Sequence, residues 1–228
     1  MNPLAGVLGE AWTMYQRHAR HLLTIAFVVY VVAALVQLLL IGALDWFGAL
    51  LAVVVGIVAA FLLQAALVKA VEDVRDGRAD LTLGDTLRAA QPFVGRVAIA
   101  SIMAGIAIAI GLVLLIAPGL YLLTIWCLIV PVIVLEGASV GVAFDRSRQL
   151  VRGYEWQVFG TLVLVFLLLF AVNLVITIVL LALPQELRNS IAGLVSGTLV
   201  APFLALVVTL GYFRLLTTSR APGGPPSQ

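Results

Sequence analysis

Long stretches without a charged residue are the feature that most limits what this chain can fold into. The first covers residues 22–44, and the second covers residues 46–68 after the single charged residue Asp45. Each exceeds the roughly 20 apolar residues with which a helix crosses the hydrocarbon core of a bilayer. Because only 11% of the residues are charged, against roughly a quarter in soluble domains, we expect an integral membrane protein.

Three further apolar stretches, the first long enough for two spans, bring the predicted number of membrane spans to six. The charge-free run 97–135 is about twice as long as one span of roughly 20 residues, and Pro118-Gly119 near its middle predicts a tight turn. The last two spans, residues 158–183 and 190–213, are separated by the polar turn 184–189. Connections this short join antiparallel neighbours, so we expect an all-α membrane bundle built from three helical hairpins.

The distribution of basic residues predicts which side of the membrane each loop faces. Lys and Arg near the ends of spans are retained on the cytoplasmic side. Of the 13 Lys and Arg residues, Arg188 alone falls in a predicted outer turn, and Asp45, Pro118 and Glu186 mark those turns. We therefore expect both termini in the cytoplasm. The single lysine, Lys69, beside many arginines and alanines is typical of a GC-rich bacterial genome, which favours a bacterial inner membrane.

A segment with helical spacing of apolar residues precedes each hairpin. The three segments begin near residues 4, 82 and 140, and each sets apolar side chains against charged ones. In the second segment, Thr82 and Asp85 have the spacing of a capping box. We expect three interfacial helices on the cytoplasmic side.

This arrangement predicts a threefold internal repeat in a single membrane domain of residues 1–216. The repeat-like units cover about residues 4–77, 82–136 and 139–216, and three such hairpins are expected around an approximate three-fold axis. The alternative is that any three cytoplasmic linkers would be amphipathic without a repeat. The tail 217–228, rich in Gly and Pro, is expected to be disordered.

Sequence patterns for catalysis, metal binding or cofactor binding are not found. The nucleotide-binding, GxSxG and HExxH motifs are absent, and His18 and His21 have no acidic or thiol partner nearby. Cys127 lies in an apolar stretch, where packing is the expected role. We therefore expect no catalytic residues, no cofactor and no metal. The net charge of +2 gives no indication of nucleic-acid binding.

Polar and small residues inside the spans predict contacts between helices. Asn173 and Thr177, four residues apart, could line a polar path, but interhelical hydrogen bonding is the commoner use of such residues. Two series of small residues predict close helix crossings, namely Ser101, Gly105 and Ala109, and Gly193, Gly197 and Ala201. Pro131 predicts a bend in the fourth span, which is either purely structural or opens room for a ligand.

Charges concentrate at the predicted inner boundary between the fourth and fifth spans. Two hypotheses apply to Arg146, Arg148 and Arg152. They form a collar that pairs with Glu136, Asp145 and Glu155 at the helix ends, or they bind the phosphate groups of lipids.

A longer signature resembles one known group of bacterial membrane proteins. It comprises Pro118-Gly119-Leu120-Tyr121, Trp126, Pro131, Glu136-Gly137, Ala143, Arg146-Ser147, Leu150-Val151, Arg152-Gly153, Trp156 and Tyr212-Phe213-Arg214. The signature resembles the family related to the membrane domain sometimes fused to glycerophosphoryl diester phosphodiesterase, which includes small six-span proteins. The resemblance covers most of the chain and implies the fold. Because the sequence lacks the phosphodiesterase domain, the resemblance does not imply diester hydrolysis.

Together these observations predict a non-enzymatic integral membrane protein. Its expected role is to organise the membrane, or to bind anionic lipids or a protein partner, with a homo-oligomer left open. The alternative is a small-molecule or lipid transporter. A proton-coupled carrier is disfavoured, because such carriers usually place ionisable groups deep in their spans and no charged residue or histidine lies there in this sequence.

Overall fold

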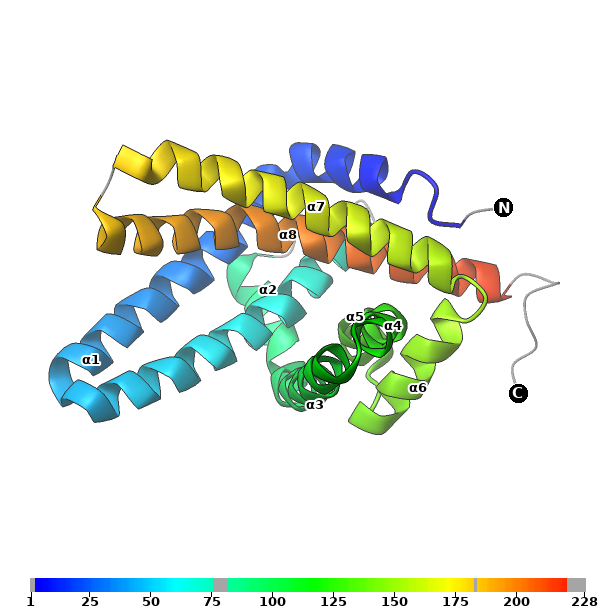
Figure 1. Ribbon diagram of the computed structural model, residues 1–228, viewed down its shortest axis with the longest axis horizontal. Coiled ribbons are helices and arrows are strands. Elements are labelled where there is room, and N and C mark those ends of the chain that lie inside the picture. Colours follow the sequence, from blue (N-terminus) through cyan, green and yellow to red (C-terminus); the bar gives the residue numbers. More distant parts are fainter. Residues whose placement is uncertain (1–2, 76–81, 183, 221–228) are drawn as a thin grey trace.

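The computed structural model describes residues 3–75, 82–182 and 184–220, and the regular secondary structure in these ranges is helical (Figure 1). Within this part of the chain, six segments are long and apolar enough to cross a membrane, which confirms the all-helical class and the number of candidate spans. The helices are α1 (Val7–Arg75), α2 (Leu83–Ala90), η1 (Gln91–Phe93), α3 (Val94–Leu114), α4 (Ile116–Trp126), α5 (Ile129–Glu136), α6 (Val140–Val151), α7 (Glu155–Val179), η2 (Leu180–Ala182) and α8 (Gln185–Arg220).

The first hairpin is formed within α1. The helix reverses direction between its two candidate spans, Val7–Leu44 and Trp46–Arg75, as Figure 1 shows. Gly48 allows this reversal, because a Cβ atom there would collide with the carbonyl of Leu40. The predicted turn next to Asp45 is therefore present.

The second hairpin turns at Leu115 rather than at Pro118-Gly119. Leu115 has extended backbone angles, φ −157° and ψ 130°, between the end of α3 and the start of α4. Pro118 is the third residue of α4, where a helix needs no backbone N–H donor. Gly119 lets the two helices meet, because a Cβ atom there would lie 2.6 Å from the backbone nitrogen of Leu112. The Pro-Gly pair thus follows the turn instead of forming it.

The fourth span is broken between α4 and α5, which end and begin at Trp126 and Ile129. Pro131 explains the position of the break, because a proline cannot donate to the carbonyl four residues earlier, here that of Cys127, and its ring crowds that carbonyl. The bend expected from Pro131 therefore lies about one turn before it.

The third hairpin consists of α7 and α8, which lie antiparallel and side by side (Figure 1). Helix α8 continues to Arg220, so the first residues of the tail expected to be disordered are helical. The hydroxyls of Thr217 and Thr218 donate to the carbonyl of Arg214 in this last turn.

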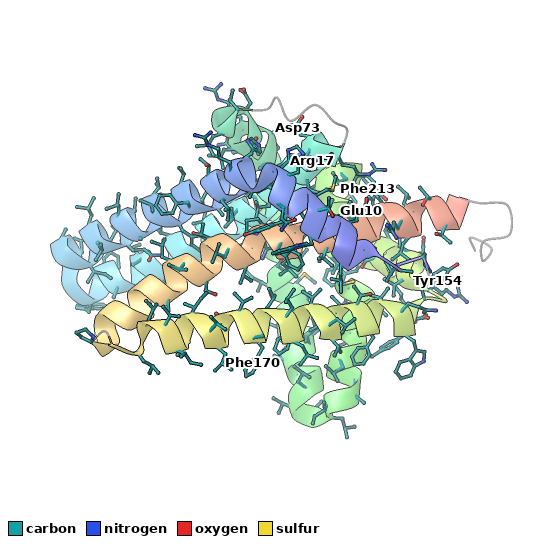
Figure 2. All side chains as sticks on the ribbon, turned by 90° about the horizontal axis from the view of Figure 1, so that it is seen from above. Glu10, Arg17, Asp73, Tyr154, Phe170 and Phe213 are labelled. Atoms are coloured by element: carbon teal, nitrogen blue, oxygen red, sulfur yellow. The ribbon has the colours of Figure 1, made fainter. Side chains whose placement is uncertain are left out.

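The three hairpins are not parallel. In Figure 1, α3 and α4 are seen nearly end-on while α7 and α8 lie across the view, and Figure 2 shows the α3–α4 hairpin crossing α7. Ala117 at the start of α4 lines the same cavity as Glu155 at the start of α7. This crossed arrangement differs from the expected three-fold one, because the second hairpin does not share the direction of the third. The sequence repeat itself stays a prediction.

The core lies where α1, α5 and α8 meet. Its largest fully buried side chains include Leu22 and Leu67 of α1, Ile133 of α5, and Leu206 and Leu210 of α8. The outer surface of the spans is also apolar, and Figure 2 shows Phe170 on the outward side of α7, where it is 62% exposed. Such a surface suits contact with lipid rather than water.

One of the two series of small residues marks a close helix crossing. A Cβ atom on Gly197 of α8 would lie 2.7 Å from the ring of Tyr30 in α1, so glycine is needed there. Gly105 of α3 has open space around it, and the buried face of α3 instead carries Val97, Ala100 and Ala104. Among the described residues no neighbouring helix approaches Gly105, so the close crossing expected there is wrong.

Candidate functional site

The first predicted interfacial segment continues into α1 and packs along α8. The hydroxyl of Tyr15 donates to the carbonyl of Leu199 at 3.1 Å, and the rings of Trp12 and Tyr15 meet Phe203 edge-on. The guanidinium of Arg214 binds the carboxylate of Glu10, and Figure 2 shows Glu10 near Phe213 where α1 crosses α8. This segment is therefore attached to α8, and its position at a membrane interface stays a prediction.

The other two segments form separate short helices, α2 and α6. The backbone N–H of Asp85 donates to the Thr82 hydroxyl oxygen at 3.2 Å, so the N-cap predicted for α2 is present. On α6, the buried residues are Ala143, Ser147, Leu150 and Val151. Both helices are amphipathic, and both pack against the helical core with their apolar side.

Glu136 is the centre of a polar cluster at the end of α5. Its carboxylate accepts from Nε of Arg146, 3.2 Å from each carboxylate oxygen, and from the hydroxyl of Tyr212 at 2.7 Å. The side chains of Glu136 and Arg146 are 28% and 31% exposed, and Tyr212 is buried. The cluster therefore ties α5, α6 and α8 together in a partly desolvated place where charge-assisted hydrogen bonds are strong.

The last turn of α5 is held by a further arginine. Gly137 ends the helix with φ +68°, a left-handed conformation that glycine adopts without strain. Arg96 of α3 donates through Nη1 to the carbonyl of Gly137 at 2.6 Å and to that of Ala138 at 3.3 Å. These bonds satisfy carbonyl groups that have no partner within the helix.

Ser147 of α6 bonds the backbone groups that are left without a helical partner at the break in the fourth span. Its fully buried hydroxyl donates to the carbonyl of Ile125 at 2.7 Å and accepts from the backbone N–H of Leu128 at 3.3 Å. A helix break inside a membrane protein needs such a partner, because no water is there to bond the freed backbone groups. The roles of Ser147 at this break and of Tyr212 beside Glu136 were not expected, although both residues belong to the signature.

The three arginines of the predicted site have different surroundings. Arg146 is engaged by Glu136, as the collar hypothesis expects. Arg148 and Arg152 are exposed, and within the described residues neither side chain has a hydrogen bond or an ion pair. The structure thus separates one structural arginine from two that are open to an external anion.

Asn173 lies on the side of α7 next to α8, and Thr177 follows one turn later on the same helix. The amide oxygen of Asn173 accepts from the hydroxyl of Ser196 at 2.6 Å, and its amide nitrogen donates to the carbonyl of Leu169 at 2.8 Å. Thr177 donates to the carbonyl of Asn173 on its own helix. The Asn173–Ser196 contact links two helices, and neither residue lines any of the cavities described below.

Three of the cavities between the described helices have volumes of several hundred Å³. One of about 270 Å³ lies at the break before Pro131, between α1, α5 and α8. A second, of about 530 Å³, shares Tyr30 and Ala60 with it. A third, of about 480 Å³, lies where α4 crosses α7. In the ranges that the structure describes, no group of three His, Cys, Asp or Glu side chains is placed to hold a metal ion.

Comparison with known proteins identifies no relative, since no family model, curated protein or solved structure matches this chain. The geometry of the site therefore carries the functional argument.

Proposed function

We propose that the protein is a non-enzymatic, multi-pass protein of a bacterial inner membrane that binds anionic lipid headgroups, or a partner carrying similar charge, and so helps to organise the membrane. The observation that supports this is that some arginines have a partner within the fold and others do not. Arg75, Arg96, Arg146 and Arg214 are held by aromatic, carbonyl or carboxylate groups of the fold. Arg148 and Arg152 have no such partner among the described residues, so their charge is available to a phosphate group.

The proposed orientation places both termini in the cytoplasm. Figure 1 supports it, because the ends of the described chain lie together and the tips of the first and third hairpins lie at the opposite end. The basic residues favour the side of the termini as the cytoplasmic one.

Cysteine labelling of intact cells tests this topology. In a Cys127→Ala background, Asp45→Cys is expected to react with a membrane-impermeant thiol reagent from outside, whereas Asp85→Cys reacts after the cells are opened. The reason is that Asp85 is exposed in the first turn of α2, which faces the cytoplasm in the proposed orientation. Labelling of Asp85→Cys in intact cells would overturn the orientation.

The headgroup site predicts that the double variant Arg148→Gln/Arg152→Gln retains less anionic lipid. Each basic residue at an anionic leaflet contributes about 1 kcal/mol, so the two together correspond to roughly a 30-fold change in affinity. Native mass spectrometry of the protein in mild detergent, at low and moderate salt, measures the bound lipid.

Arg88→Gln is the matched control for this experiment. Arg88 is also exposed, but it lies 3.9 Å from the Asp85 carboxylate, which offsets its charge. Unchanged lipid retention in a folded double variant would leave Arg148 and Arg152 without the proposed role.

Membership of the small six-span family is part of this proposal. It is supported by contacts between signature residues, since Glu136 accepts from Arg146 and from Tyr212, which is 76 positions further along the chain.

Transport of a neutral lipid or small molecule is the second candidate function. The observation that favours it is the pair of adjoining cavities that meet at Tyr30, whose linings include Gln37 and Gln64 but no charged residue. Faster flipping of a labelled phospholipid in vesicles that contain the protein would favour this candidate over the first.

A further inference from the structure

One face of α4 and one face of α7 meet where the two helices cross, and they line a common cavity. The face of α4 consists of Ala117, Leu120, Tyr121 and Thr124, which follow one another at helical spacing. The face of α7 consists of Glu155, Trp156 and Phe159. Together these seven residues line the cavity of about 480 Å³, which is within the usual size range of small-molecule sites, roughly 300–1,000 Å³.

The aromatic side chains of this cavity are open to a ligand. Trp156 is 82% exposed and Tyr121 is 49% exposed, although both are large and partly apolar. The rings of Trp156 and Phe159 are 6.1 Å apart and nearly perpendicular, at 83°. The faces of such rings carry negative partial charge, so a cation placed within about 6 Å of a ring centre is attracted.

Glu155 gives the cavity a net negative charge. Its carboxylate is partly buried, and within the described residues it has no hydrogen bond or ion pair, although Arg152 is three positions before it. A partly desolvated carboxylate beside aromatic faces favours a positively charged partner. It disfavours a phosphate or carboxylate ligand for the same reason.

We propose that this cavity binds the ammonium group of an amphiphile, with Glu155 as the counter-ion and Trp156, Tyr121 and Phe159 as the aromatic wall. Leu120 and the neighbouring apolar surface of α4 would contact the hydrocarbon part of the same molecule. The inference goes beyond the proposed anionic-lipid site and does not need Arg148 or Arg152. Two sources share this chemistry, namely an aminophospholipid of the membrane and a soluble amine.

Lipid retention by the full-length protein in mild detergent tests the proposal. The probes are phosphatidylethanolamine and phosphatidylglycerol with identical chains, because they share the phosphate and differ in the ammonium group. In the Arg148→Gln/Arg152→Gln background, which lacks the proposed anionic-lipid site, the protein is expected to retain the ethanolamine lipid about tenfold better by native mass spectrometry. In Glu155→Gln and in Trp156→Leu this preference is expected to disappear, and Trp156→Phe should restore part of it.

Trp46→Leu is the matched control, because Trp46 is also exposed, at 75%, and also meets a neighbouring phenylalanine edge-on, but it does not line this cavity. Competition by soluble phosphoethanolamine at equal concentration would assign the site to a free amine, and its failure would assign the site to the lipid. An unchanged preference after Glu155→Gln is added with no loss of thermal stability, or no preference in the Arg148→Gln/Arg152→Gln background, would overturn the proposal. Because this background already lacks Arg148 and Arg152, the two proposed sites can fail independently.

Discussion

Replacing Ser147 with alanine is expected to destabilise the protein by about 3 kcal/mol. The substitution removes a hydroxyl that serves both the carbonyl of Ile125 and the N–H of Leu128 at the break in the fourth span. Each buried backbone group left without a partner costs about 1–3 kcal/mol. Unfolding in mild detergent, followed by circular dichroism as temperature or denaturant increases, measures the loss.

Ser139→Ala is the control for this measurement. Ser139 precedes α6, is exposed and makes no capping hydrogen bond with its side chain, so its loss is expected to change stability by less than about 0.5 kcal/mol. If both variants unfolded alike, Ser147 would not be what stabilises the break.

The spans were predictable from sequence, whereas their arrangement was not. Length without charge is enough to predict a membrane helix, because no other environment tolerates it, and the six candidate spans follow from that. The direction of each hairpin depends on contacts between distant residues. Nothing in the run 97–135 indicates that the second hairpin crosses α7, because its outer surface is apolar on all sides and suits several directions equally.

Two sequence expectations were corrected for one physical reason: the same residue pattern suits more than one structure, and contacts with other helices decide between them. Pro118 signals a turn and also suits the first turn of a helix, and the backbone uses the second option with Leu115 as the turn. Gly105 and Gly197 have the same spacing of small neighbours, but a close crossing needs a partner helix on that face, and only Gly197 has one. The segment before the first span is amphipathic whether it lies on a membrane or on α8, so its sequence pattern could not distinguish the two.

The candidate site was predictable in part. A cluster of charges at the end of the fourth span indicated Glu136 and Arg146, but spacing alone could not show that Arg146 is held while Arg148, two positions later, is free. On a helix, residues two apart point in different directions, so the side that faces Glu136 and Tyr212 decides which arginine is engaged.

This difference predicts that substitutions of Arg146 and Arg148 affect stability differently. Arg146→Gln is expected to destabilise the protein by about 2 kcal/mol, because it leaves the Glu136 carboxylate in a partly buried place with Tyr212 as its remaining partner. The loss is expected to be smaller than the roughly 3–5 kcal/mol of a fully buried pair, since both side chains are about a third exposed and solvent screens them. Arg148→Gln is expected to leave stability unchanged.

A double-mutant cycle separates the ion pair from other effects of the substitutions. Glu136→Gln and Arg146→Gln should each reduce stability, and the combined variant should lose less than the sum, with a coupling of about 1–2 kcal/mol between the two positions. Tyr212→Phe in the Glu136→Gln background should cost little, because the hydroxyl then no longer donates to a charged acceptor. Additive losses would show that Glu136 and Arg146 do not stabilise each other. The contact between α5, α6 and α8 would then depend on apolar packing rather than on this ion pair.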